Sequence, residues 1–223
     1  MKTQNKISVI VIARNEEKNL HDCLKTVDWV DEIIVVDDGS EDKTVEIAKN
    51  YGARVFEKTG GSFSELRNKG AKESYGEWLL YIDADEKVTP LLREEIKSKI
   101  QARSAKLRLI PSAKRQSMLN SKFVAYAVPR KNILLGKEMK YGGWWPDYVL
   151  RLIKKDSLKA WVGELHEQPE VRGEIGKLEN PLIHNTHRNL TEMVEGPVGY
   201  PATPAYGRHH YRSGCFPSSV WLV

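Results

Sequence analysis

Hydrophobic residues in the N-terminal half of the chain follow two alternating patterns. Short runs that are apolar on both faces and rich in β-branched residues are typical of buried parallel strands. They occur at 7–13, 32–38, 53–58 and 77–83, the third closer to a sheet edge. Helices are expected around Leu20–Val27, between an N-cap at Ser40 and a stop at Gly52, from Phe63 to Tyr75, and around Leu92–Ile100. Repeated strand–helix units predict an α/β fold with a mostly parallel sheet flanked by helices.

The pattern changes after residue 102. Residues 103–122 are basic and irregular, which predicts a loop or lid, with a disordered segment as the alternative. Strand-like runs return at 122–130, 148–155 and 159–167, around an aromatic turn at 141–147. We therefore expect a single domain over residues 1–195.

Residues 196–223 differ from the rest in composition. They contain no Asp, Glu or Lys, yet they hold four of the 10 prolines and four of the 16 glycines. No helical or alternating pattern survives there. The two interpretations are a natural disordered tail and an out-of-frame end to an otherwise intact gene. The second is preferred, and both predict low order.

The overall composition, 40% hydrophobic and 29% charged, is that of an ordinary globular protein. The formal net charge of +5 suits an anionic partner such as a nucleotide, a phosphorylated glycan or a membrane surface. Cys23 and Cys215 form no CxxC motif, which favours a reducing compartment. The first apolar run leads into charged residues instead of a cleavage site, and no run reaches the ~20 apolar residues of a membrane span. A cytoplasmic location is therefore expected.

Polar clusters follow three of the predicted strands, as "ARNEE", "DDGS" and "DADE". Ligands of open parallel sheets bind outside the carboxyl ends of the strands, so the clusters would line one crevice if these strands are neighbours. In "DDGS", Gly39 allows a tight turn before a helix N-terminus, which favours anions, and the aspartates can accept hydrogen bonds from a base or a ribose. The alternative is a turn with capping acids.

The "DADE" cluster suggests a metal site. If the strand continues, Asp83 and Asp85 point to the same side, where their mutual repulsion would be relieved by a cation. Mg²⁺ or Mn²⁺ is typically held by one or two carboxylates together with substrate phosphates, and it would neutralise charge on a departing diphosphate. The alternative is a solvated acidic turn.

In combination these motifs resemble the family 2 glycosyltransferases of GT-A fold, and more closely their lipopolysaccharide-core β-1,4-glucosyltransferase branch. The matching segments lie between Lys6 and Glu195 and read "VIARNEEKNL", "DEIIVVDDGSEDKT", "ELRNKGAKESYGEWLLYIDADE" and "YGGWWPDYVLRLIKK". The resemblance implies a Rossmann-like GT-A domain with a nucleotide-sugar half at 1–102 and an acceptor and catalytic half at 122–195. It also implies inverting, metal-dependent transfer of a hexose, glucose in this branch, from a UDP-sugar.

The resemblance assigns roles to individual residues. It implies a nucleotide pocket formed by Ala13, Arg14, Asn15 and Glu16, a uracil-binding acid at Asp37 or Asp38, and a basic contact at Arg67. Asp83 would face the ribose and Asp85 the metal. His166 is a candidate second metal ligand, with a hydrogen-bonded structural histidine as the alternative. For His184 and His187 a role other than metal binding is preferred, such as phosphate contact.

Inverting transfer needs a base that deprotonates the acceptor hydroxyl. Asp147 is preferred because it stands where the family carries an acid, although Pro146 replaces the second acid that often precedes it. Glu167 is the rival, and Glu164 is a third candidate. Trp144 and Trp145 are expected to stack on an acceptor sugar, with core packing as the alternative.

The function expected from the resemblance is transfer to a bacterial surface glycan such as lipopolysaccharide core. A lipid-linked acceptor would bring the protein to the inner face of the plasma membrane, where the basic segment from Arg103 to Arg115 could meet anionic lipid, or could be a solvated loop. A nucleotidyltransferase and a non-catalytic or inactivated nucleotide-sugar-binding homologue remain alternatives. The absence of GxGxxG disfavours a dinucleotide oxidoreductase, and no nucleic-acid-binding motif occurs.

Overall fold

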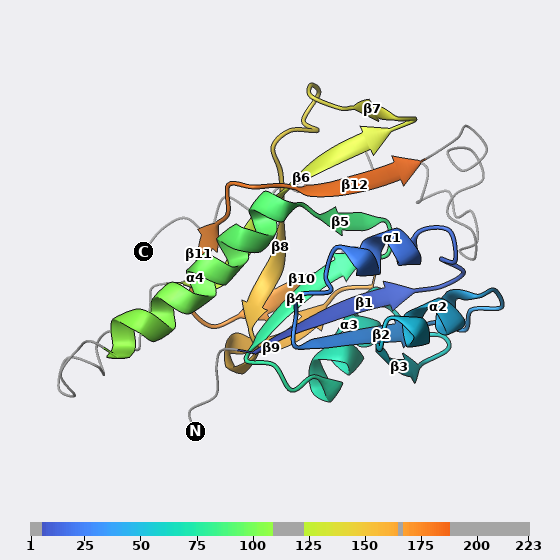
Figure 1. Cartoon of the computed structure of the whole chain (residues 1–223), viewed down its shortest axis with the longest axis horizontal. Helices are drawn as coiled ribbons and strands as arrows, with labels where there is room; N and C mark the ends of the chain where they lie inside the picture. Colours follow the sequence, from blue (N-terminus) through green and yellow to red (C-terminus); the bar gives the residue numbers. More distant parts are fainter. Residues whose placement is uncertain (1–5, 109–122, 165–166, 188–223) are drawn as a thin grey trace.

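The structure is a computed structural model, and it describes residues 6–108, 123–164 and 167–187, with residues 101–108 and 187 described by their backbone alone (Figure 1). Its helices are α1 (Leu20–Lys25), α2 (Thr44–Asn50), α3 (Phe63–Glu73) and α4 (Pro90–Arg108). Its first strands are β1 (Ile7–Ala13), β2 (Glu32–Asp37), β3 (Arg54–Glu57), β4 (Trp78–Asp83), β5 (Glu86–Val88) and β6 (Phe123–Leu134). The others are β7 (Lys137–Glu138), β8 (Asp147–Lys154), β9 (Leu158–Val162), β10 (Gln168–Val171), β11 (Glu174–Lys177) and β12 (Leu182–His187).

One large sheet runs through the described chain in the order β3-β2-β1-β4-β8-β6-β12-β5. Strands β1, β2, β3 and β4 run parallel to one another, because a crossover joins each of them to the strand that follows it in the chain. β8 then runs antiparallel to both β4 and β6. The mostly parallel sheet and the edge position of β3 confirm what the hydrophobic pattern predicts.

The core lies on both faces of this sheet. Side chains of β1 alternate between two apolar clusters, Val9 and Val11 in one and Ile10 and Ile12 in the other, as the two-residue period of a strand requires. The first cluster also holds apolar residues of α1, α2 and α4, and the second holds those of α3 and β9. Because every residue of β1 is buried, each of its Ile and Val side chains contributes about 1.5–3 kcal/mol to stability.

Helix α3 lies very close to β1 because it presents a glycine to the sheet. A Cβ atom at Gly70 would come within 2.4 Å of Cγ2 of Ile10. The helix begins with a capping box, in which Ser62 accepts from the backbone of Glu65 and Glu65 accepts from the backbone of Ser62. A well-defined start and a close packing face fix the position of Arg67, which lies on the same helix.

Three expectations for the helices and strands are wrong. Ser40 is not the N-cap of α2, which begins at Thr44 with Lys43 in the cap position, because the Ser40 hydroxyl already bonds Asp37 at the end of β2. Helix α4 continues through residues 103–108, where a loop is expected from the sequence. The strand expected at 159–167 ends at Val162.

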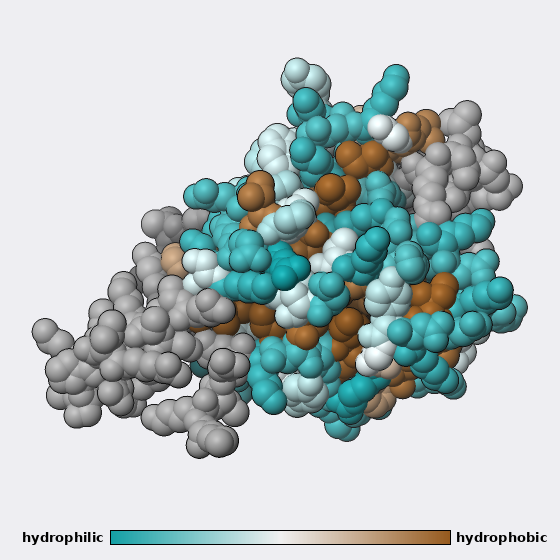
Figure 2. All heavy atoms as spheres, viewed as in Figure 1, coloured by the Kyte–Doolittle hydropathy of each residue, from teal (hydrophilic) through white to brown (hydrophobic). Residues whose placement is uncertain are grey.

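The remaining part of the basic segment, 109–122, and the atypical tail, 196–223, lie outside the described residues. On the face shown in Figure 2, hydrophilic side chains cover most of the described surface, with apolar side chains visible between them. Among the described helices, none is long and apolar enough to cross a membrane.

Candidate active site

Three polar strand ends meet at one edge of the sheet. In the register of β1 with its neighbours, Ala13 is opposite Asp37 of β2, and Ile12 is opposite Asp83 of β4. The condition under which the three clusters share one crevice, that these strands are neighbours, is therefore met. Parallel strands end at a common edge, so the segments after β1, β2 and β4 line the position where ligands of such sheets bind.

The turn after β2 separates the roles of its two aspartates. Asp37 accepts hydrogen bonds from the backbone of Gly39 at 3.1 Å and of Ser40 at 2.9 Å, and from the Ser40 hydroxyl at 2.6 Å. Its carboxylate therefore shapes the turn, in which Gly39 adopts a φ of 75°. Asp38 instead accepts from the backbone of Gly60 at 2.8 Å and lies 3.5 Å from Arg14.

The segment after β1 folds against the same turn. Asn15 has a left-handed φ of 54°, accepts from the backbone of Glu41 at 2.8 Å, and donates its own N–H to the Ser40 hydroxyl at 2.9 Å. The backbone of Glu16 donates to Thr44 at 2.7 Å. The structure thus brings together the residues expected in the nucleotide pocket, Ala13, Arg14, Asn15, Glu16 and Asp38, at one end of β1 and β2.

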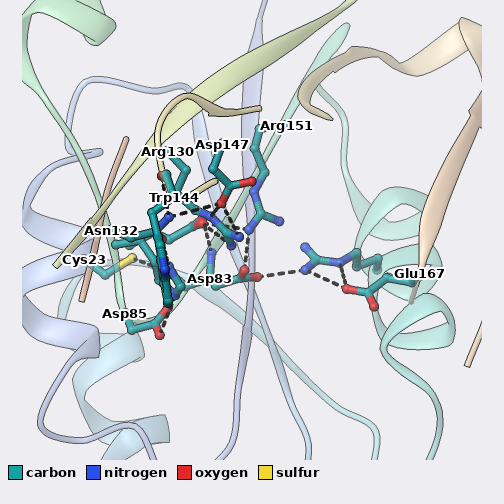
Figure 3. A network of polar contacts seen from close by, with 12 residues as sticks. Cys23, Asp83, Asp85, Arg130, Asn132, Trp144, Asp147, Arg151 and Glu167 are labelled. Carbon is teal, nitrogen blue, oxygen red and sulfur yellow. Dashed lines mark hydrogen bonds and ion pairs between the residues drawn. The ribbon is translucent and has the colours of Figure 1, made fainter. Parts of the chain in front are cut away.

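Asp83, the last residue of β4, lies between two buried arginines (Figure 3). Its Oδ1 is 2.8 Å from Nη2 of Arg67, and its Oδ2 accepts from Nη2 of Arg151. Burial alone would raise the pKa of Asp83, but the guanidinium groups of Arg151 and Arg67 outweigh burial and hold the pKa well below its usual range. Asp83 is therefore an anion that fixes both arginines.

Arg67 is held on its other side by aromatic rings and a second carboxylate. It is 3% exposed, and its guanidinium lies 4.7 Å from the ring centroid of Trp161. Its Nη2 and Nε atoms lie 3.2 and 3.3 Å from Oε1 of Glu167. Arg67 therefore joins Glu167 to Asp83, and it is a buried residue of the site although it belongs to a helix.

Glu86, the last letter of "DADE", is a fully buried partner of the network. Its Oε1 lies 2.8 Å from Nη2 of Arg151 and 3.7 Å from Nη1 of Arg130, and its Oε2 accepts from the backbone of Asp83 at 3.0 Å. Burial would lower the pKa of Arg151, but Asp83 and Glu86 outweigh burial and raise it. The "DADE" turn is thus fixed by buried ion pairs.

Asp147 begins β8 and faces β6. The register places it opposite Arg130, whose Nε and Nη2 atoms lie 2.8 and 2.7 Å from Oδ2 of Asp147. The side-chain nitrogen of Asn132 donates to the same oxygen at 3.2 Å. Within the described residues, no hydrogen bond reaches Oδ1 of Asp147, so one carboxylate oxygen is held and the other is available to accept a proton.

Asp85 lies beside a histidine, His184 of β12. Nε2 of His184 is 3.3 Å from Oδ2 of Asp85, while Nδ1 of His184 is 2.7 Å from Oδ1 of Asn132. The register accounts for this contact, since His184 is opposite Asn132 of β6 on one side and Glu86 of β5 on the other. The expectation that His184 has a role other than metal binding stays a prediction, and the contact with Asp85 adds metal binding as a second candidate role.

The donor set at Asp85 fits a divalent cation shared with a substrate phosphate. Adjacent ligands of an octahedral ion at about 2.1 Å are about 3 Å apart, close to the separation of the Asp85 and His184 atoms. No group of three or more His, Cys, Asp or Glu side chains that could hold a metal occurs within the described residues. The pKa of the Cys23 thiol is raised far above its usual range, mainly by burial and to a smaller extent by the nearby Glu86. The Cys23 thiol therefore stays neutral.

The two candidate bases lie apart (Figure 3), because Asp147 is bound by Arg130 and Asn132, whereas Glu167 is bound by Arg67. The backbone oxygen of Trp144 accepts from Asn132 at 3.4 Å, and Trp145 is 40% exposed. His166 lies outside the described residues. The structure adds functional candidates that sequence reasoning missed, namely Glu86, Arg130, Asn132 and Arg151, and it places His184 beside Asp85. Their only signal is polar residues interrupting strand-like segments such as "VPRKN", "LRL" and "LIHNTH".

Comparisons with known proteins agree with this geometry. The family model described as "Glycosyl transferase family 2" matches residues 8–159. The glycosyltransferase YibD of Escherichia coli K12 is 33% identical over 105 residues, which cover 43% of this chain and 30% of YibD. The chain covers 24% and 32% of the length of two other curated relatives, so it corresponds to a minor part of each.

Two solved structures share the fold. S. aureus TarS in complex with UDP-GlcNAc has a TM-score of 0.60 at 18% identity, covering 82% of this chain and 59% of TarS. Glucosyl-3-phosphoglycerate synthase of Mycobacterium tuberculosis, in complex with Mn²⁺, UDP and glucosyl-3-phosphoglycerate, has a TM-score of 0.52 at 17% identity, covering 85% of this chain and 75% of that one. The chain therefore belongs to glycosyl transferase family 2 and has the GT-A fold.

Proposed function

We propose that the chain transfers a hexose, glucose by its resemblance, from a UDP-sugar to a bacterial surface glycan such as lipopolysaccharide core, with inversion at the anomeric carbon. The observation that carries the proposal is the arrangement at the end of β4. There Asp85 and His184 form a pair 3.3 Å apart, and Asp147 is joined to that pair through Asn132. A metal-bound diphosphate at this pair would lie next to a carboxylate suited to be the base.

The donor would lie across the carboxyl ends of β1, β2 and β4. Asp38, which faces Arg14 and the Gly60 backbone, is the better uracil-binding candidate, since the Asp37 carboxylate is used by its own turn. The complexes of TarS with UDP-GlcNAc and of the mycobacterial synthase with UDP support a nucleotide-sugar donor. Asp83 would contact the ribose while it holds Arg67 and Arg151.

Mg²⁺ or Mn²⁺ would be held by Asp85 and His184. His166, the histidine expected there from the sequence, lies outside the described residues and stays a further candidate. When bound, the cation would supply positive charge to the diphosphate leaving group. Mn²⁺ in the complex of the mycobacterial synthase supports a divalent cation.

Asp147 would act as the base. Its Oδ2 is held by Arg130 and Asn132, which leaves Oδ1 to accept the proton of the acceptor hydroxyl as that hydroxyl attacks the anomeric carbon. The attack comes from the face opposite the diphosphate, which inverts the configuration. Glu167 is the weaker candidate, because it is bound to Arg67 and has no link to the Asp85–His184 pair like the one that Asn132 gives Asp147.

The acceptor would bind over Trp144 and Trp145, where a pyranose face can stack on an exposed ring. A lipid-linked acceptor would bring the protein to the inner face of the plasma membrane from the cytoplasm. The acceptor class and this location follow from the resemblance. The exposed fraction of Trp145, 40%, supports a surface that can receive a sugar.

The test is transfer of radiolabelled glucose from UDP-glucose to lipopolysaccharide-core acceptors with Mn²⁺ or with chelator. We expect transfer only with Mn²⁺, a loss of at least about 100-fold in kcat for Asp147→Asn, and a much smaller loss for Glu167→Gln. Asp156→Asn, a substitution in the turn between β8 and β9, serves as the control and should retain activity. Transfer by Asp147→Asn at the wild-type rate would exclude Asp147 as the base, and donor binding without transfer would favour a non-catalytic homologue.

A further inference from the structure

Asn132 is the side chain that connects the Asp85–His184 pair with Asp147. It lies on β6, between β8 and β12, and is 2% exposed. Its Oδ1 is 2.7 Å from Nδ1 of His184, and its Nδ2 is 3.2 Å from Oδ2 of Asp147 (Figure 3). We infer that Asn132 is a positioning residue that sets the proton position on His184 and the orientation of Asp147 through one amide. This inference rests on the proposed function, which makes Asp85 and His184 metal ligands.

The orientation of the Asn132 amide is fixed by its partners. Its Nδ2 faces the backbone oxygen of Trp144 at 3.4 Å and the carboxylate of Asp147 at 3.2 Å. A backbone carbonyl and a carboxylate accept hydrogen bonds but do not donate them. A flipped amide would place its oxygen against both acceptors, so the donor nitrogen faces them and the amide oxygen faces His184.

This orientation decides which nitrogen of His184 carries a proton. The Asn132 oxygen can only accept, so Nδ1 of His184 must donate to it. In neutral His184 the lone pair is then on Nε2, the atom that lies 3.3 Å from Asp85. A histidine that ligates a metal through one nitrogen normally donates from the other to an outer partner, which fixes its ring. Asn132 takes that outer position here.

The same amide acts on Asp147. Three donors converge on Oδ2 of Asp147, two from Arg130 and one from Asn132. Asn132 belongs to β6 and Asp147 to the neighbouring β8, so the hydrogen bond from Asn132 holds the Asp147 carboxylate in place from the adjacent strand. One residue therefore orients the base and the metal-binding histidine relative to each other.

Two substitutions separate these effects. Asn132→Asp keeps an oxygen that accepts from Nδ1 of His184, but it loses the donor to Asp147 and adds a negative charge beside it. Asn132→Leu loses both contacts. Asn180→Leu is the matched control, because the Asn180 amide donates to Glu95 at 2.9 Å, away from the site.

The first readout is the long-range ¹⁵N–¹H spectrum of the His184 imidazole in the full-length, metal-free protein. We expect a proton on Nδ1 in the wild type, in Asn132→Asp and in Asn180→Leu, and a shift toward the Nε2–H tautomer in Asn132→Leu. An Nδ1 without a proton in the wild type would overturn the inference without any variant. This readout therefore decides the matter even if Asn132→Leu fails to fold.

The second readout is Mn²⁺ affinity, measured by electron paramagnetic resonance with UDP present, together with kcat for transfer. We expect Asn132→Leu to lose about 10-fold to 100-fold in Mn²⁺ affinity. Asn132→Asp should keep that affinity and lose about 10-fold to 100-fold in kcat. Unchanged Mn²⁺ affinity in Asn132→Leu, with affinity lost in Asp85→Ala, would overturn the role inferred for Asn132 and leave the proposed metal site in place. Unchanged affinity in Asp85→Ala would overturn the proposed metal site as well.

Discussion

Asp83 and Arg67 lie 2.8 Å apart, although β4 and α3 bring them from different layers of the molecule. Asp83 also accepts from Arg151, so one carboxylate at the end of a parallel strand holds arginines from α3 and from the antiparallel β8. The ion pairs of Asp83 thus connect the parallel half of the sheet to its antiparallel half, at the edge where the donor would bind. Several expected outcomes follow from this network and its surroundings.

Replacing Asp83 with Asn should destabilise the protein by about 3 kcal/mol at neutral pH, because two buried arginines lose their shared anion. The folded-state pKa of Asp83 is held below its usual value, so its contribution is complete above the unfolded pKa of about 4 and is lost as the pH falls through the lower folded-state pKa. The free energy of unfolding from urea denaturation should therefore differ between the two proteins by a constant amount from pH 6 to 8, and the difference should shrink below about pH 4.

Asp28→Asn is the control for this series, because the exposed Asp28 lies 3.8 Å from Arg93 at the surface. Such a pair contributes about 0–1 kcal/mol. A difference between wild type and Asp83→Asn that stays constant down to pH 2 would contradict the assignment.

Glu86 and Arg151 should behave as a coupled pair. Both are buried and their charged atoms are 2.8 Å apart, so Glu86→Gln or Arg151→Met alone leaves an unpaired charge and should cost about 3–5 kcal/mol. The double variant should cost clearly less than the sum of the two single variants. Urea denaturation of the four proteins measures this coupling, and additive costs would contradict a direct ion pair.

Gly70→Ala should destabilise the fold even though alanine favours helices over glycine by about 1 kcal/mol. The new Cβ would come within 2.4 Å of Ile10 Cγ2, and overpacking of this kind typically costs about 1–3 kcal/mol. Lys72→Ala, at an exposed position of the same helix, should change stability by less than about 0.5 kcal/mol. Thermal unfolding followed by circular dichroism compares them, and a more stable Gly70→Ala protein would refute the close packing of α3 on β1.

Trp145→Ala should raise the KM for the acceptor about 10-fold. The ring is 40% exposed, and a stacking contact of about 0.5–1.5 kcal/mol, together with the buried ring area, would be lost. Leu91→Ala, at a residue that is 69% exposed on α4, should leave the KM unchanged. If Trp145→Ala keeps the wild-type KM for the acceptor, the assignment of Trp145 to the acceptor site is wrong.

The parallel half of the fold could be predicted from the sequence because its strands are continuous apolar runs. The order β2-β1-β4 could not be read from the sequence, since pairing between parallel strands leaves no local signal. Strand β12 was missed because "LIHNTH" alternates weakly and its polar side chains, such as His184, are used in the site. The loop expected from Arg103 is wrong for residues 103–108, because α4 continues to Arg108.

The candidate site could be predicted where a local motif marks it, as for Asp83, Asp85 and Asp147. Its partners could not, because each charge is matched across strands that are far apart in sequence. Arg151 is read locally as one polar residue in an apolar strand, and only the register of β8 with β4 and β6 brings it to Asp83 and Glu86. Likewise, Asn132 lies beside His184 only because β6 pairs with β12.

The most direct test of the account is calorimetric titration of UDP and UDP-glucose into the full-length protein, with Mn²⁺ and with chelator. The account predicts binding that requires Mn²⁺ and is abolished in Asp85→Ala and in His184→Ala. It also predicts that binding is retained in Asp22→Ala, which removes an exposed carboxylate 2.6 Å from Lys87. Binding that ignores the chelator, or that survives both substitutions at the site, would contradict a metal-bound diphosphate at the end of β4.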